Sequence, residues 1–328
     1  MKPENEYNER QEQQKTPETQ ERMSLKNKKI KHGHAGNTGA ENNELFASMP
    51  VAQAILMLAV PTVVSQIITI IYNMADTFFI GQTNDPMKVA AVSLATPIFM
   101  VFMALGNLFG IGGSSAISRA LGEHKPEKAK HISAFCCYGS LGVGIFMAVV
   151  SILGMELILK LIGASENTIE YARDYLFFIA LGAPFIMFGT AFGNILRGEG
   201  AARESMIGNL IGTIVNIVLD PIMILVLGWG VVGAAVATVI GNMAASLFYY
   251  IAYYLRGKST LSIHFRDFKM GDGIAVAVAA IGIPASLNNI LMSCANMVLN
   301  QMLASYGDTP VAAMGVATTV NMLVVLLQ

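Results

Sequence analysis

Charged residues and cysteines are scarce in this chain. Asp, Glu, Lys and Arg make up only 13% of its 328 residues, against about 25% in an ordinary soluble domain. The net charge is −1, so the clustered basic excess that nucleic-acid binding requires is missing. Cys136 and Cys137 are adjacent and Cys294 stands alone, which is the spacing of neither a disulfide framework nor a metal site. The composition therefore excludes a nucleic-acid partner, a disulfide-rich domain and a typical soluble fold.

Long apolar runs take the place of the missing charge. Six uncharged runs each exceed the ~20 residues that cross a bilayer core, at residues 50–75, 89–118, 132–155, 175–196, 221–255 and 273–307. Run 221–255 is too long for one helix, and its middle contains the turn Gly228-Trp229-Gly230. We therefore predict an all-α polytopic membrane protein with eight spans, at about 51–80, 88–119, 131–154, 172–196, 205–227, 231–255, 274–304 and 309 to the end.

The basic residues predict the orientation in the membrane. Residues 1–48 are polar and carry 8 of the 21 Lys and Arg residues, which indicates a disordered tail without the apolar region of an export signal. Ten of the 13 other Lys and Arg residues follow the second, fourth and sixth spans. By the positive-inside rule these loops and the N-terminus are cytoplasmic in a plasma-membrane protein.

A weak internal repeat predicts two lobes. Pro61 is followed twelve residues later by Asn73, and Pro284 is followed twelve residues later by Asn296. Residues 89–96 also match residues 311–318 at five of eight positions. Six spans separate the copies, so both copies cross the membrane in the same direction and a pseudo-two-fold axis along the membrane normal relates them.

The repeat also predicts the domain boundaries. We expect a tail at 1–48, a six-helix N-terminal lobe at 49–256, a cytoplasmic inter-lobe loop at 257–273 and the start of a second lobe at 274–328. Since a complete second copy would bring the total to about twelve spans, about four spans are expected to be missing from this chain.

Two polar stripes run along predicted spans at helical spacing. Their members are Gln66, Thr69, Asn73 and Asp76 on the first span and Asn209, Thr213, Asn216 and Asp220 on the fifth. A carboxylate inside a span is costly and usually faces a cavity, where it takes up a proton or holds a cation such as Na⁺. The amides and hydroxyls can instead join helices to one another. We expect both stripes to face one polar cavity.

Pro61 lies well inside the first predicted span. Proline removes a helical hydrogen bond there and favours a kink. The kink is either a static bend, tolerated because neighbouring helices satisfy the freed carbonyl, or a hinge that responds to Asp76 about four turns away.

Four segments resemble the multidrug and toxic compound extrusion (MATE) family. They are Pro61 with residues 71–81 (IYNMADTFFIG), residues 194–200 (NILRGEG), residues 216–221 (NIVLDP) and residues 228–238 (GWGVVGAAVAT). The resemblance implies a twelve-helix, two-lobed exporter, not an enzyme, which acts as a monomer when complete. It also implies exchange of small cationic organic compounds for H⁺ or Na⁺, with no other cofactor and with membrane lipid as the surrounding partner.

The resemblance further implies an ion site in the N-terminal lobe. The family pattern falls on Asp76, Tyr175, Asn216, Asp220 and Thr238. Three of these already belong to the polar stripes, whereas Tyr175 and Thr238 rest on the resemblance alone.

Other functions compete with export of organic cations. A lipid-linked oligosaccharide flippase of the same superfamily fits the same features, and so does a fragment that does not transport. A membrane transferase would need two aspartate-rich clusters, and no second cluster accompanies residues 216–220.

The orientation can be tested by labelling. Single cysteines introduced near Lys125 and near Gly163 should fall on opposite membrane faces. An impermeant thiol reagent added to intact cells should label the site near Gly163, because the loop around Lys125 is cytoplasmic. Preferential labelling near Lys125 would contradict the orientation.

Overall fold

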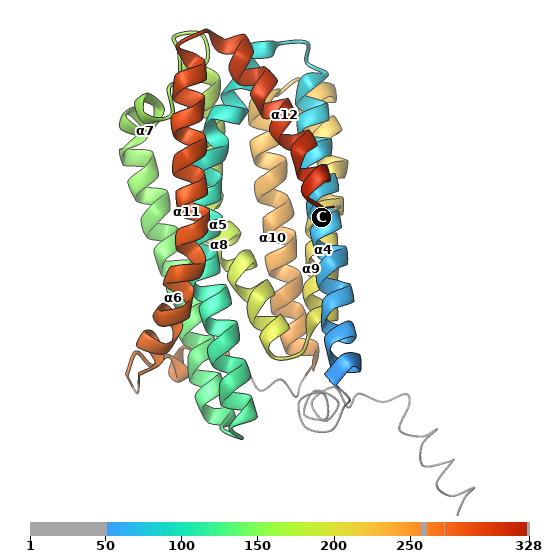
Figure 1. Ribbon diagram of the computed structural model, residues 1–328, viewed down its shortest axis with the longest axis vertical. Coiled ribbons are helices and arrows are strands. Elements are labelled where there is room, and N and C mark those ends of the chain that lie inside the picture. Colours follow the sequence, from blue (N-terminus) through green and yellow to red (C-terminus); the bar gives the residue numbers. More distant parts are fainter. Residues whose placement is uncertain (1–50, 257–260, 272, 327–328) are drawn as a thin grey trace, which may run out of the picture. The chain divides into compact units, whose positions relative to one another are not determined.

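The computed structural model describes residues 51–256, 261–271 and 273–326, and these residues contain helices and no strand. The long helices are α4 (Val51–Gly81), α5 (Pro86–Gly122), α6 (Pro126–Leu153), α8 (Ile169–Gly198), α9 (Ala202–Pro221), α10 (Val231–Arg256), α11 (Ile274–Ala304) and α12 (Asp308–Leu326). Figure 1 shows them running alongside one another. The predicted tail at 1–48 lies outside the described residues, as do residues 257–260 and 272 of the predicted inter-lobe loop.

The helices agree with the predicted spans. Among the described residues, α4 to α6 and α8 to α11 are long and apolar enough to cross a membrane, and the eighth predicted span forms α12. Three short elements add detail that the apolar runs did not predict: α7 (Met155–Leu161), the π-helical turn η1 (Ile222–Val226) and the 3-10 turn η2 (Phe265–Asp267). The chain is thus a multi-pass membrane protein.

Local sequence signals set several helix ends. Asp85 caps α5, because its side chain accepts a hydrogen bond from the backbone N–H of Met87 (3.0 Å), and Pro86 occupies the first helical position. Gly273 precedes α11 with φ 73°, a left-handed conformation that glycine adopts without steric cost. The spans therefore end at residues suited to turns.

Helix α8 is central to the packing. It contacts α5, α6, α9 and α10, while α4 packs against α9, and α11 and α12 pack against α5. Large apolar side chains remain exposed elsewhere, for example Val63 and Phe78 on α4 and Leu153 on α6. An apolar outer surface of this kind suits lipid contact and not water.

The cysteines illustrate the limit of a one-dimensional pattern. Cys136 and Cys137 are buried, as small apolar residues often are, whereas Cys294 is exposed on α11. An apolar run identifies a span but does not say which face of the helix packs inward.

Two of the helices that carry the repeat, α4 and α11, have matching lengths. Both α4 and α11 have 31 residues, and Pro61 and Pro284 each occupy the eleventh position. Neither proline divides its helix into two elements. The matching lengths agree with the repeat seen in the sequence.

Glycines allow α5 and α11 to pack closely across the boundary between the two predicted lobes. A Cβ atom on Gly112 would collide with the carbonyl oxygen of Val278, and one on Gly282 would collide with the carbonyl oxygen of Leu108. Small residues are the usual means of close helix packing in membranes. The two backbones therefore touch only because both positions are glycine.

This contact predicts the cost of adding one methyl group. Gly282→Ala should destabilise the protein by about 1–3 kcal/mol, because the backbones must separate. Thermal unfolding of the purified protein in detergent would measure the loss. Gly142→Ala on α6 is the matched control, since a Cβ there meets no atom within 4 Å. Equal melting temperatures for the two variants would contradict the contact.

Candidate functional site

Asp76 lines a small cavity near the Gly81 end of α4. This Asp76 cavity has a volume of about 120 Å³ and is walled by α4, α5, α8, α11 and α12. Tyr175 of α8 is buried and lines it together with Asn73 and Thr77 of α4. Asp76 is its only charged lining residue among the described residues. The volume suits a few water molecules or a small ion better than an organic compound.

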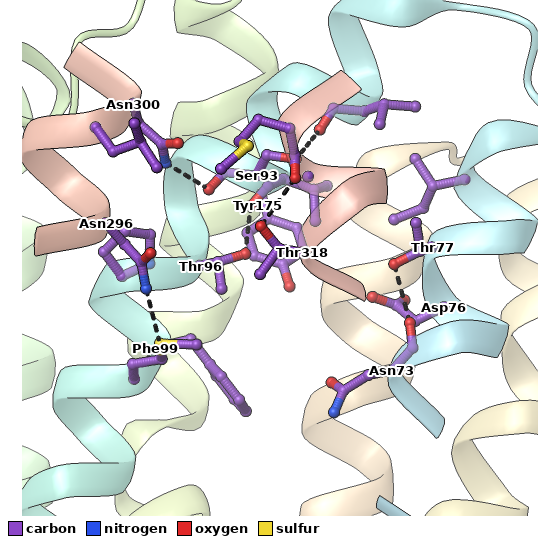
Figure 2. Close-up of a pocket in the computed structure, with 18 of the residues that line it drawn as sticks. Asn73, Asp76, Thr77, Ser93, Thr96, Phe99, Tyr175, Asn296, Asn300 and Thr318 are labelled. Atoms are coloured by element: carbon purple, nitrogen blue, oxygen red, sulfur yellow. Dashed lines mark hydrogen bonds between the residues drawn. The ribbon is translucent and has the colours of Figure 1, made fainter. Parts of the chain in front are cut away.

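The wall opposite α4 is polar as well. Figure 2 shows Asn296 and Asn300 on one side of the view and Asn73, Asp76 and Thr77 on the other. Asn300 donates a hydrogen bond to the backbone carbonyl of Ser93 on α5 (3.1 Å). The cavity therefore lies between α4 of the first predicted lobe and α11 of the second.

Asp76 retains an unsatisfied oxygen. Its Oδ1 atom is buried and has no hydrogen-bond partner. Buried polar groups are nearly always bonded, so such an atom needs an explanation. The carboxyl group can take up a proton, which makes it neutral, or this oxygen can contact a bound cation.

A larger cavity lies toward the other end of the helices. This Arg197 cavity has a volume of about 480 Å³, within the range of drug-sized ligand sites. Eight of its polar lining residues are amides, namely Gln66, Asn73, Asn107, Asn194, Asn209, Asn216, Asn242 and Asn289. Arg197 is its only charged lining residue in the described part of the chain.

Tyr72 connects the two cavities. It lines both of them, as do Asn73 and Phe99. Its hydroxyl lies 3.3 Å from Thr238 Oγ1 on α10, within hydrogen-bond distance. Tyr72 was not among the residues predicted from the sequence, although its spacing of three from Thr69 and four from Asp76 places it on the same helix face.

The hydrogen bonds continue from Thr238 to Asp220. With its amide oriented to satisfy both neighbours, Asn216 accepts a bond from the backbone N–H of Thr238 (3.1 Å) and donates one to Asp220 Oδ2 (3.0 Å). All three residues are buried. Asn216 and Thr238 line the Arg197 cavity, while Asp220 lines neither cavity and lies behind Asn216.

The remaining stripe residues line the Arg197 cavity and also join helices. Asn209 donates hydrogen bonds to the Ser65 carbonyl (3.1 Å) and to Thr69 Oγ1 (3.2 Å), which connects α9 to α4. Gln66, Thr213 and Asn73 line the cavity too. The stripes therefore do face polar space, but that space comprises two cavities instead of the single one expected.

A π-helical turn follows Asp220. Pro221 ends α9, and the backbone N–H of Leu227 bonds to the carbonyl of Ile222 (2.8 Å), five residues earlier. Such turns occur frequently at functional sites in helices. Pro61, by contrast, lines neither cavity and lies inside the unbroken helix α4.

No set of three His, Cys, Asp or Glu side chains gathers as a metal site in the residues the structure describes. The oxygen-rich Asp76 cavity is where a small cation would find a carboxylate, since Asp76 lines it and Tyr175, Thr77 and Asn300 supply further polar groups.

A bundle of apolar helices around two internal polar cavities defines a polytopic membrane protein with ligand-sized internal space. A model of the MatE family matches residues 61–222. Multidrug export protein MepA of Staphylococcus aureus (strain NCTC 8325) is 35% identical over 272 residues, which are 83% of this chain and 60% of that protein. MepA of Staphylococcus saprophyticus is 37% identical over the same shares.

Solved structures show the same fold. An inward-facing multidrug resistance MATE transporter of the MOP superfamily superposes with a TM-score of 0.74 at 33% identity, over 82% of this chain and 61% of that one. A MOP superfamily transporter from Pyrococcus furiosus, whose binding pocket of reverse polarity suggests a different function, superposes with a TM-score of 0.78 at 32% identity, over 89% and 64%.

The chain belongs to the MATE family. Its structural relatives have the twelve-helix, two-lobed fold expected from the repeat. The chain spans about 60% of the length of the curated relatives that it matches.

The bond between Tyr72 and Thr238 can be tested by a double-mutant cycle. Tyr72→Phe and Thr238→Val should each destabilise the protein by about 0.5–1 kcal/mol, and the double variant should cost less than their sum, because both remove one bond. Thermal unfolding in detergent would measure all three. The control pair is Tyr171→Phe with Thr238→Val, whose effects should add. Additive effects of Tyr72→Phe and Thr238→Val would show that the hydroxyls do not interact.

Proposed function

We propose that this chain belongs to a secondary antiporter that exports small cationic organic compounds in exchange for H⁺ or Na⁺. The relatives that it matches are multidrug export proteins. The sizes of the two cavities fit the two proposed ligands. The Arg197 cavity, of about 480 Å³, accommodates a drug-sized molecule, and the Asp76 cavity, of about 120 Å³, accommodates an ion. Because these relatives are named as exporters of multiple drugs, they also favour this proposal over a lipid-linked oligosaccharide flippase.

The buried, unpartnered oxygen of Asp76 carries the proposal. Burying a carboxylate without a partner is costly, and a proton or a bound cation relieves that cost. A site that is most stable when occupied by an ion binds and releases that ion as access to each side of the membrane changes. Asp76 is therefore the residue through which the ion supply drives export.

Tyr72 offers a physical route from the ion to the substrate. It lies one helical turn from Asp76, lines both cavities and bonds to Thr238. A change of charge on Asp76 shifts the favoured position of this hydroxyl, and with it the Thr238–Asn216–Asp220 hydrogen bonds beside the Arg197 cavity. Coupling of this kind needs a differential contact in each state, which the shared residue provides.

The remaining expectations stay with this proposal. The protein lies in the plasma membrane with residues 1–48 in the cytoplasm, acts as a monomer when complete and uses no cofactor besides the coupling ion. Pro61 supplies a bend in α4 that changes between states as Asp76 gains or loses its ion.

Asp76→Asn tests the coupling role directly. An amide has nearly the same shape but cannot titrate or hold a cation with a full charge, so the variant should fold normally and lose ion-coupled export. The measurement is substrate-stimulated H⁺ or Na⁺ flux in proteoliposomes containing the complete protein, with a pH gradient or a Na⁺ gradient imposed separately. Flux should fall at least about tenfold, and Asp220→Asn should reduce it less.

Asp174→Asn is the matched control, because Asp174 is exposed and lines neither cavity although it lies next to Tyr175. Its flux should equal that of the wild type. Wild-type flux from Asp76→Asn at equal protein level would reduce Asp76 to a structural residue.

A further inference from the structure

The charge of Arg197 has no counter-ion in the described structure. Its guanidinium donates to two neutral oxygens, Asn194 Oδ1 (2.6 Å) and Ser205 Oγ (3.1 Å). The four ion pairs between described residues all lie elsewhere. Because a guanidinium carries five N–H donors, three of them have no partner among the described residues.

The position of Arg197 makes this charge accessible to a ligand. It lies in the last turn of α8 and lines the 480 Å³ cavity, whose other described lining residues carry no charge. The carbonyl end of α8 stabilises a cation there, but it supplies only a partial charge. The side chain of Asn194 is itself fixed, because its Nδ2 donates to Asn107 Oδ1 (3.1 Å) and to the Thr190 carbonyl (2.8 Å). Its Oδ1 therefore holds the Arg197 guanidinium in a defined position.

The two cavities therefore have opposite polarity. Among the described lining residues, the Asp76 cavity has a carboxylate and no cation, whereas the Arg197 cavity has a cation and no carboxylate. Tyr72, Asn73 and Phe99 line both cavities. A compound that is only cationic would meet an unopposed guanidinium in the larger cavity. A compound that carries an anionic group as well would pair that group with Arg197.

We propose that Arg197 binds the carboxylate of zwitterionic substrates in the larger cavity, with the cationic part of the molecule directed toward the Asp76 end. The fork of a guanidinium matches a carboxylate in a bidentate pair. This inference rests on the proposed export of organic compounds and specifies their class.

A pair of dyes isolates the carboxylate. Rhodamine 110 carries a carboxylate and a delocalised cation, and rhodamine 123 is its methyl ester, which has the same ring system without the anion. Fluorescence polarisation with the purified full chain in lipid nanodiscs gives both dissociation constants. We expect rhodamine 110 to bind about tenfold more tightly than rhodamine 123.

Three variants locate the effect. Arg197→Gln should reduce the preference for rhodamine 110 to about one, and Arg197→Lys should retain part of it. Asn194→Asp should also abolish the preference, because it places a counter-ion beside an intact guanidinium. This variant tests the proposal even if Arg197→Gln does not fold. Arg203→Gln is the control for loss of one positive charge, since Arg203 is exposed and does not line the cavity. It should leave the preference unchanged.

The outcomes separate this inference from the proposed function. Equal affinities for the two dyes in the wild type, or a preference that survives both Arg197→Gln and Asn194→Asp, would overturn the role of Arg197. Efflux of rhodamine 123 tests export independently, because that dye has no carboxylate. If neither dye binds, both the inference and the proposed export of such compounds fail.

Discussion

Inside a bilayer, each polar group must find its partner within the protein, and the site depends on this constraint. The backbone meets it by forming helices. Among the side chains, Asn209 bonds to α4, and Asn216 bonds to both Asp220 and the backbone of Thr238. Since the bilayer core contains no water to form hydrogen bonds, an amide or a carboxylate without a protein partner is costly there. Asp76 and Arg197 are two charged residues that have no counter-ion among the described residues, and each lines a cavity.

Small residues create the space in which these groups lie. Gly112 and Gly282 bring α5 against α11, and Gly212 and Gly241 bring α9 against α10, because a Cβ at any of the four would press on a facing carbonyl oxygen. Gly212 and Gly241 also line the Arg197 cavity, where the lack of a side chain leaves room for a ligand. Glycines therefore serve both the close contacts between helices and the space beside them.

The shared wall at Tyr72 relates the two cavities. Under the proposed function, an ion near Asp76 and a compound near Arg197 would occupy different cavities, and Tyr72, which bonds to Thr238 of α10, lines both cavities. Two ligands that bias the position of the same group influence each other's affinity reciprocally. The π-turn after Pro221 lies on the same route, just beyond the carboxylate of Asp220.

The sequence alone determined the spans, the MATE family and the polar stripes, because hydropathy and helical spacing are local properties of the chain. It selected Asp76 and Asp220 as candidate site residues from the cost of placing a carboxylate in lipid, and Asn216 from its place on the same polar stripe as Asp220. It could not show that the stripes face two cavities, that Asp220 lies behind Asn216, or that Tyr72 belongs to both cavities. It placed Arg197 in a segment that resembles the family and among the cytoplasmic charges, but not in a cavity. Those features depend on which helices lie opposite one another, and that is decided by contacts such as Gly112 with Val278, between residues far apart in the sequence.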